Sequence, residues 1–243
     1  MPRTTDPARV PQRLLGPLAV KAIVFDVDGT LYRQGPLRRA MLMRLLTAHI
    51  VHPRRAWRTF TVLRAYRHAQ EHLRGDHGGD IAAAQIAVTS ERTNIDESAV
   101  TTCVTRWMER EPLAFLPRCL QPGMVEFLRA CKGRGLRLGA FSDYPAEDKL
   151  RAMGVSELFD VVLSAQSPGV GALKPNPRGL LVTLERLGAT PSDALYVGDR
   201  VDVDAAAARA AGVRCAILTR HASTGAAYVA VSGYPQLHDL LWR

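Results

Sequence analysis

The feature that most constrains the fold of this chain is a short apolar segment, residues 22–25, that ends in two carboxylates and a glycine. Its unbroken run of aliphatic and aromatic residues predicts a strand covered on both faces, as in parallel sheets. Asp26 and Asp28 follow two residues apart, so the alternation of side chains along an extended chain places them on the same side. Adjacent carboxylates repel each other, and either a shared proton or a divalent cation relieves that repulsion. The segment therefore indicates a buried strand whose carboxyl end carries chemistry.

The second half of the chain alternates between short strand-like runs and helical stretches. Strands are expected over residues 136–141, 159–163, 194–197 and 213–218. This alternation predicts an α/β fold with a Rossmann-like, doubly wound parallel sheet. Ligands of such sheets bind beyond the carboxyl ends of the strands, and here Ser142 and Asp199 each follow a predicted strand. We expect these side chains to meet Asp26 and Asp28 at one edge of the sheet.

A block without strand-like runs separates the first strand from the rest of the sheet. Its apolar residues recur at helical spacing, which predicts helices near residues 36–50, 54–73, 80–91 and 96–110. We expect its leucine, methionine and tryptophan side chains to pack in the interior. The predicted organisation is a flexible N-terminal segment over 1–18, a core formed by 19–34 and 117–243, and an inserted all-helical cap over 35–116.

The charge of the chain is strongly positive, with a formal net charge of +9. Such a field attracts anions, although charge alone does not select which anion. The first half of the helical block is rich in arginine: Arg33, Arg38, Arg39, Arg44, Arg54, Arg55, Arg58, Arg64, Arg67 and Arg74. Two interpretations remain open, a solvated basic face and a cap that recognises additional negative charge on a substrate.

The cysteines and the hydropathy pattern indicate an intracellular setting. The four cysteines are widely separated and form no Cys-x-x-Cys pair, which argues against a zinc knuckle or a disulfide scaffold. Prolines interrupt the first 17 residues, and no apolar run approaches the length of a membrane span. We expect a cytoplasmic protein with reduced thiols and without a membrane partner.

Four short segments, taken in order, resemble the motifs of the haloacid dehalogenase superfamily of phosphohydrolases. They are Asp26-Val27-Asp28-Gly29-Thr30, Ser142, Lys174-Pro175, and Gly198-Asp199 with Asp204. The resemblance covers residues 21–218, with the helical block where members with a helical cap carry it, and points to relatives similar to phosphoglycolate phosphatases. Asp143 departs from the pattern, because many members have asparagine there; this difference is expected to affect local hydrogen bonding or substrate preference.

The resemblance implies a role for each catalytic residue. Asp26 is the expected nucleophile, which forms an aspartyl-phosphate, and Asp28 is the expected general acid and base. Ser142 and Lys174 are expected to bind the phosphoryl group and to stabilise its charge in the transition state, and Asp143 is expected to lie among the substrate-binding residues.

The resemblance also implies a Mg²⁺ ion, since oxygen ligands suit this hard cation. Its expected ligands are the side chains of Asp26 and Asp199 and the backbone carbonyl of Asp28. Asp204 is expected to have a secondary role, in which it orients Lys174 or a metal-bound water. Asp202 fits a helix N-cap.

The sequence thus predicts a Mg²⁺-dependent phosphatase that acts on a small phosphorylated metabolite. A phosphomutase of the β-phosphoglucomutase type would keep the same motifs and is the enzymatic alternative. A catalytically silent binding protein is the alternative from another class, but a binder has no use for both Asp26 and Asp28. Nucleic acid is not expected as a partner, and the oligomeric state stays open.

Overall fold

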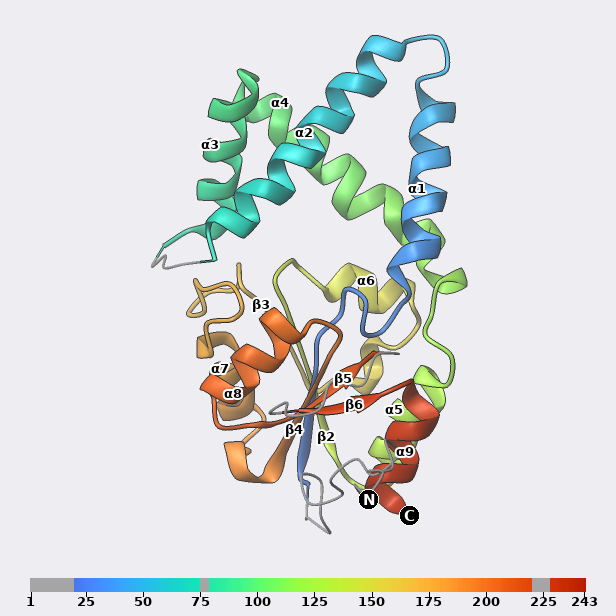
Figure 1. The fold of residues 1–243 in the computed structure, drawn as a ribbon, viewed down its shortest axis with the longest axis vertical. Helices are drawn as coiled ribbons and strands as arrows, with labels where there is room; N and C mark the ends of the chain where they lie inside the picture. Colours follow the sequence, from blue (N-terminus) through green and yellow to red (C-terminus); the bar gives the residue numbers. More distant parts are fainter. Residues whose placement is uncertain (1–19, 75–78, 220–227) are drawn as a thin grey trace, which may run out of the picture.

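The centre of the molecule is a six-stranded, all-parallel sheet. The computed structural model describes residues 20–74, 79–219 and 228–243. Within them the strand order is β3-β2-β1-β4-β5-β6, and every neighbouring pair is parallel (Figure 1). The strands are β1 (Ala22–Phe25), β2 (Arg137–Ser142), β3 (Val161–Ser164), β4 (Ala194–Gly198), β5 (Arg214–Leu218) and β6 (Val229–Val231). This order is that of a doubly wound sheet, which confirms the predicted fold class.

Helices cover both faces of the sheet because the central strand is apolar on both. Ile23 and Phe25 face one hydrophobic cluster, and Ala22 and Val24 face another. The first cluster lies under α5 (Met124–Gly133), α6 (Glu147–Ala152) and α9 (Tyr234–Trp242), and the second under α7 (Arg178–Arg186) and α8 (Ala206–Ala210) (Figure 1). Three further short helical turns are formed by Ser156–Leu158, Pro191–Asp193 and Val201–Ala205.

An all-helical cap stands over the carboxyl ends of the strands (Figure 1). It contains α1 (Gln34–Ala48), α2 (Pro53–His72), α3 (Ile81–Thr93) and α4 (Glu97–Val104), followed by a π-helical turn at Thr105–Arg110 and a 3₁₀ segment at Glu111–Arg118. Asp80 and Asp96 cap α3 and α4 by accepting backbone N–H groups. The boundaries of the three parts of the chain remain a prediction, and the segment expected to be flexible lies outside the described residues.

The expected interior packing of the cap is wrong for part of it. Leu45 is buried, but Leu42, Leu46 and Trp57 are 53%, 51% and 72% exposed. Helical spacing shows which face of a helix is apolar, but it does not show whether another element covers that face. Strand β6 and helix α9 lie outside the elements that the sequence pattern predicts.

No helix among the described residues is long and apolar enough to span a bilayer.

The lower end of the cap packs directly on the core. Leu73 and Ile81 from the cap share a small cluster with Ala165 and Leu173 from the core. Tyr66 of α2 stacks on Tyr144, with ring centroids 6.1 Å apart. These contacts hold the cap against the sheet edge at which the predicted functional residues lie.

Candidate active site

Three adjacent strands bring the predicted site residues to one edge. Asp26 directly follows β1, Ser142 ends β2 and Asp199 directly follows β4. Since β1 pairs with both β2 and β4, these residues come from neighbouring strand ends. Gly29 allows the chain to leave β1, because it has φ +109° and a Cβ atom there would lie 2.0 Å from Asp199 Oδ2. The expected meeting of strand ends is confirmed.

Asp26 is buried and is held by two side-chain donors. Lys174 Nζ donates to its Oδ1 at 2.6 Å, and Thr30 Oγ1 donates to its Oδ2 at 3.0 Å. Burial raises the pKa of Asp26, and the charge of Lys174 only partly opposes this shift. The carboxyl group is therefore positioned for reaction, but it depends on positive charge to stay ionised.

Lys174 is a fully enclosed cation shared by three acceptors. Besides Asp26, its Nζ donates to Asp204 Oδ1 at 2.7 Å and to the Tyr196 hydroxyl at 3.2 Å. Burial alone would lower the pKa of Lys174, but the charges of Asp204 and Asp26 outweigh it and raise the pKa well above its usual value. Lys174 thus supplies a permanent positive charge beside Asp26.

Asp204 organises the loop after β4 as well as the lysine. Its Oδ2 accepts the backbone N–H groups of Asp199 and Arg200 at 3.1 and 3.0 Å. Its contact with Lys174 agrees with the positioning role predicted for it. Asp202, in contrast, lies inside the short helix at Val201–Ala205 rather than at its N-cap, and it pairs with Arg200 in solvent. The N-cap interpretation of Asp202 is wrong.

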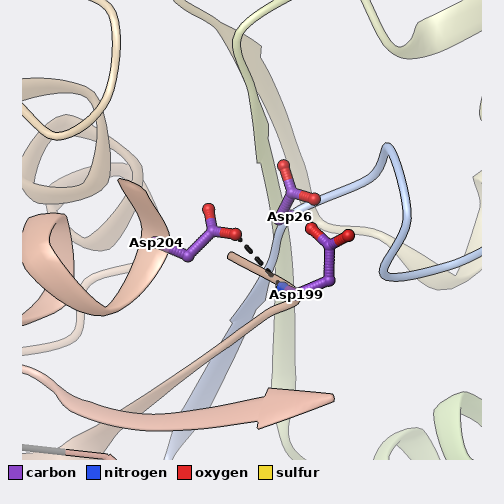
Figure 2. Close-up of side chains that lie close together, drawn as sticks. All are labelled: Asp26, Asp199 and Asp204. Carbon is purple, nitrogen blue, oxygen red and sulfur yellow. Dashed lines mark hydrogen bonds between the residues drawn. The ribbon is translucent and has the colours of Figure 1, made fainter. Parts of the chain in front are cut away.

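The carboxylates of Asp26, Asp199 and Asp204 form an acidic cluster (Figure 2). Each offers one oxygen within 4.8 Å of the others. Both oxygens of Asp204 already accept hydrogen bonds, whereas no donor among the described residues is recorded for the Asp199 carboxylate. Burial, followed by repulsion from Asp204, raises the pKa of Asp199 to about 7. The Asp199 carboxylate, which lacks a donor among the described residues and is repelled by its acidic neighbours, fits a hard divalent cation held together with Asp26.

Asp28 has a different environment from the one the sequence suggested. Lys149 Nζ donates to both of its carboxylate oxygens, at 2.6 and 2.8 Å, and the Tyr32 hydroxyl donates to Oδ1. Burial alone would raise the pKa of Asp28. The contacts with Lys149 and Tyr32 lower this pKa by a larger amount, so the net shift is downward. Its backbone carbonyl, the expected metal ligand, accepts a hydrogen bond from Gln34 Nε2 at 2.6 Å.

Ser142 and Asp143 lie together at the end of β2 but have different partners. Ser142 is buried, and its Oγ accepts the Tyr144 N–H at 3.3 Å. Asp143 Oδ1 accepts the backbone N–H of Lys174 at 3.1 Å, and Oδ2 accepts from Arg74 at 2.7 Å. Asp143 thus contacts both the loop that carries Lys174 and the cap.

Sequence reasoning missed Arg74 and Lys149. Arg74, two residues beyond the end of α2, donates to the Asp143 carboxylate and, at 2.6 Å, to the Lys174 backbone carbonyl. It was one of ten similar arginines, and nothing in its sequence context distinguishes it. Lys149 gave a usable signal: it is one of four lysines in the chain, and α6 begins soon after the β2 loop.

The fold and the site define an α/β protein with an acidic centre and a buried lysine at the carboxyl edge of its sheet. A model of the haloacid dehalogenase-like hydrolases matches residues 20–212, and the chain belongs to this family. The resemblance drawn from the four motifs is therefore confirmed.

Relatives cover most of the chain. It is 28% identical over 208 residues to a glyceraldehyde 3-phosphate phosphatase of Methanopyrus kandleri, covering 80% of this chain and 82% of the relative. It is 28% identical over 208 residues to a phosphoglycolate phosphatase of Rhodospirillum rubrum, covering 82% and 79%. Among solved structures, CbbY of Rhodobacter sphaeroides in complex with phosphate is 25% identical with a TM-score of 0.55, covering 90% of this chain and 96% of that one. The expectation of a phosphatase of this family is confirmed.

Proposed function

We propose that the chain is a Mg²⁺-dependent phosphatase that hydrolyses a small phosphomonoester through a phosphorylated Asp26. The observation that carries this proposal is the 2.6 Å contact between Lys174 Nζ and Asp26, with the Asp199 carboxylate beside them. A nucleophilic carboxylate, a fixed cation and a second acid on one sheet edge are what phosphoryl transfer requires. The phosphatase relatives support this reaction, and the substrates in their names make phosphoglycolate and glyceraldehyde 3-phosphate the first compounds to test.

In the first step, an oxygen of Asp26 attacks phosphorus and the bond to the leaving oxygen breaks. Asp28 gives a proton to that oxygen. Lys174 offsets the negative charge of Asp26 and of the phosphoryl group, and the buried Ser142 hydroxyl donates to a phosphoryl oxygen. Mg²⁺, held by Asp26, Asp199 and the Asp28 carbonyl, would reduce the repulsion between the nucleophile and its anionic substrate.

In the second step, water attacks phosphorus and the bond to Asp26 breaks, which releases inorganic phosphate. Asp28 takes the proton of that water, so it must be ionised at this point. Its contact with Lys149 favours the ionised form before substrate binds. Protonation of Asp28 for the first step therefore requires that Lys149 be drawn away, and the negative charge of the substrate is suited to do this.

Phosphate release from a panel of phosphomonoesters, measured with Mg²⁺ and with EDTA, tests the proposal. We expect release only with Mg²⁺, with one compound preferred, and a loss of about 10³-fold or more in Asp26→Asn because the nucleophile is gone. Asp148→Asn, an exposed acid on α6, is the matched control. Undiminished release by Asp26→Asn would contradict the proposal, and conversion of a sugar phosphate to its isomer without release would show a mutase instead.

A further inference from the structure

The far end of the cap carries an apolar surface that nothing in the described chain covers. It lies where α1 turns into α2, at the end of the cap away from the sheet (Figure 1). We call it the tip patch; its members are Leu42, Met43, Leu46, Ile50, Val51, Trp57 and Phe60. They account for seven of the nine large exposed hydrophobic residues recorded in the described chain. An apolar cluster of this kind, rimmed by polar residues, marks an interaction surface.

The tip patch has members on α1, on α2 and on the turn that joins these helices. Leu42 and Leu46 are four residues apart on α1, and Met43 is three residues from Leu46, so all three share one helix face. The turn adds Ile50 and Val51, which are 80% and 77% exposed. On α2, Trp57 and Phe60 contact each other, with ring centroids 6.0 Å apart.

Four exposed arginines lie close in sequence to the residues of the tip patch and have no acidic partner among the described residues. Arg39, Arg54, Arg55 and Arg58 are exposed, and none of them forms a recorded salt bridge with another described residue. No aspartate or glutamate occurs from residue 33 to residue 70. This arginine rim, defined by those four residues, leaves a local field that is positive throughout.

We propose that the tip patch binds the surface of a lipid bilayer that contains anionic headgroups. Apolar side chains, including an exposed tryptophan, enter the interfacial region, and the surrounding arginines contact headgroup phosphates. The positive rim is complementary to a negative membrane surface, which attracts each nearby arginine. This proposal differs from the expectation of no membrane partner, and only for contact at the membrane surface.

Two other occupants fit the patch less well. A second copy of the chain that used the same tip would bring two acid-free arginine rims together, and their like charges would repel. Nucleic acid phosphates would bind the arginines. The exposed apolar side chains of Ile50 and Val51, however, form no hydrogen bond or ion pair with phosphates or bases. A bilayer uses the apolar and the basic residues together, and it leaves the active site free because the tip is the opposite end of the cap (Figure 1).

Vesicle sedimentation with the whole chain tests the proposal. The probes are vesicles of phosphatidylcholine alone and of phosphatidylcholine mixed with phosphatidylglycerol. We expect binding to the mixed vesicles to be stronger by about tenfold or more and to weaken as salt is added, because the arginines contribute a screened attraction. Trp57 emission should shift to shorter wavelength on binding, as its ring leaves water.

Paired variants separate the apolar from the electrostatic contribution. Ile50→Ser with Trp57→Ser removes apolar contact, and Arg54→Gln with Arg55→Gln removes charge; each pair should weaken binding by about tenfold. Leu181→Ser and Arg186→Gln on α7 are matched exposed controls that should bind normally. All of these side chains are exposed, so circular dichroism should report the same helical content throughout.

Three results would overturn the proposal. The first is no binding to the mixed vesicles, and the second is equal binding by the tip variants and the wild-type chain. The third is a concentration-dependent dimer, seen by light scattering after size-exclusion chromatography, that Ile50→Ser with Trp57→Ser abolishes, since a second copy would then occupy the patch.

Discussion

Lys174 is a residue whose stability role and catalytic role can be measured separately. Lys174→Gln removes a buried cation and leaves Asp26 and Asp204 without their shared partner. We expect a loss of about 3 kcal/mol in the free energy of unfolding and a fall of about 10² or more in kcat/KM. Urea unfolding and phosphate-release kinetics measure the two effects.

The matched control for Lys174→Gln is Lys132→Gln, which removes a surface pair with Asp160. It should change stability by less than about 1 kcal/mol and leave kcat/KM unchanged. A destabilised Lys174→Gln protein that kept full kcat/KM would show that Lys174 acts only in folding.

Lys149 should set the pH range of the reaction through Asp28. Since Lys149 helps to lower the pKa of Asp28, Lys149→Met removes a group that favours ionisation, and the pKa of Asp28 rises. The second step needs ionised Asp28, so the acid limb of the kcat profile should move to higher pH. Lys132→Met is the control, and an unmoved acid limb in Lys149→Met would argue against Asp28 as the base.

At the scale of whole elements, Arg74 and Asp143 connect the cap to the lysine loop. Asp143 accepts the N–H of Lys174, and Arg74 donates to the carbonyl of the same residue, so the pair satisfies both polar backbone groups of Lys174. The pair also explains the departure at position 143, because an asparagine would keep the first contact but lose the ion pair. Cap position and lysine position are therefore linked in this structure.

A double-mutant cycle tests that link. Asp143→Asn should lower kcat/KM about tenfold, because Arg74 loses its buried acidic partner and keeps only its ion pair with the half-exposed Glu71. Arg74→Gln should do the same, and the double variant should be no worse than either alone, since both break one interaction. Arg106→Gln, a cap arginine that pairs with Glu111, is the control. Strictly additive losses would show that the two residues act independently.

The regular elements near the sheet were predictable because their patterns are local. Ala22–Phe25 and Ala194–Gly198 are apolar runs followed by polar residues. In the cap, apolar residues recur at helical spacing. Val229–Val231 is too short to carry a pattern of its own and gains its strand only by pairing with β5. Such pairing depends on the folded sheet, so local sequence does not reveal it.

The motif residues of the site were predictable for a similar reason, whereas their partners were not. Asp26 and Asp199 each follow a strand and Ser142 ends one, and parallel strands bring their ends together. Arg74 and Lys149 reach the site only through contacts 69 and 121 residues distant in sequence. Such contacts depend on how the cap and α6 pack on the core, which the local sequence does not show.

At the scale of the whole molecule, the acidic cluster should couple metal binding to folding. Asp199 has its pKa raised to about 7, so above that pH its ionised form destabilises the metal-free fold. We expect Mg²⁺ to raise the Tm of the chain at pH 8 by about 3 °C or more, since it binds the folded state.

Asp199→Asn gives the matched test of that coupling. Without metal, this variant should melt higher than the wild-type chain at pH 8, because one of the repelling charges is gone. Added Mg²⁺ should then have little effect on its Tm. A wild-type Mg²⁺ shift that persists in Asp199→Asn would place the cation elsewhere.

The phosphorylation of Asp26 is tested most directly by trapping the phosphorylated residue. Borohydride reduces an acyl phosphate to an alcohol, so quenching the enzyme with borohydride during turnover and mapping its peptides by mass spectrometry identifies the nucleophile. We expect homoserine at position 26, dependent on substrate and Mg²⁺, in a chain whose Asp28 is unmodified. Homoserine at another position, or an unmodified Asp26 while phosphate is being released, would contradict it.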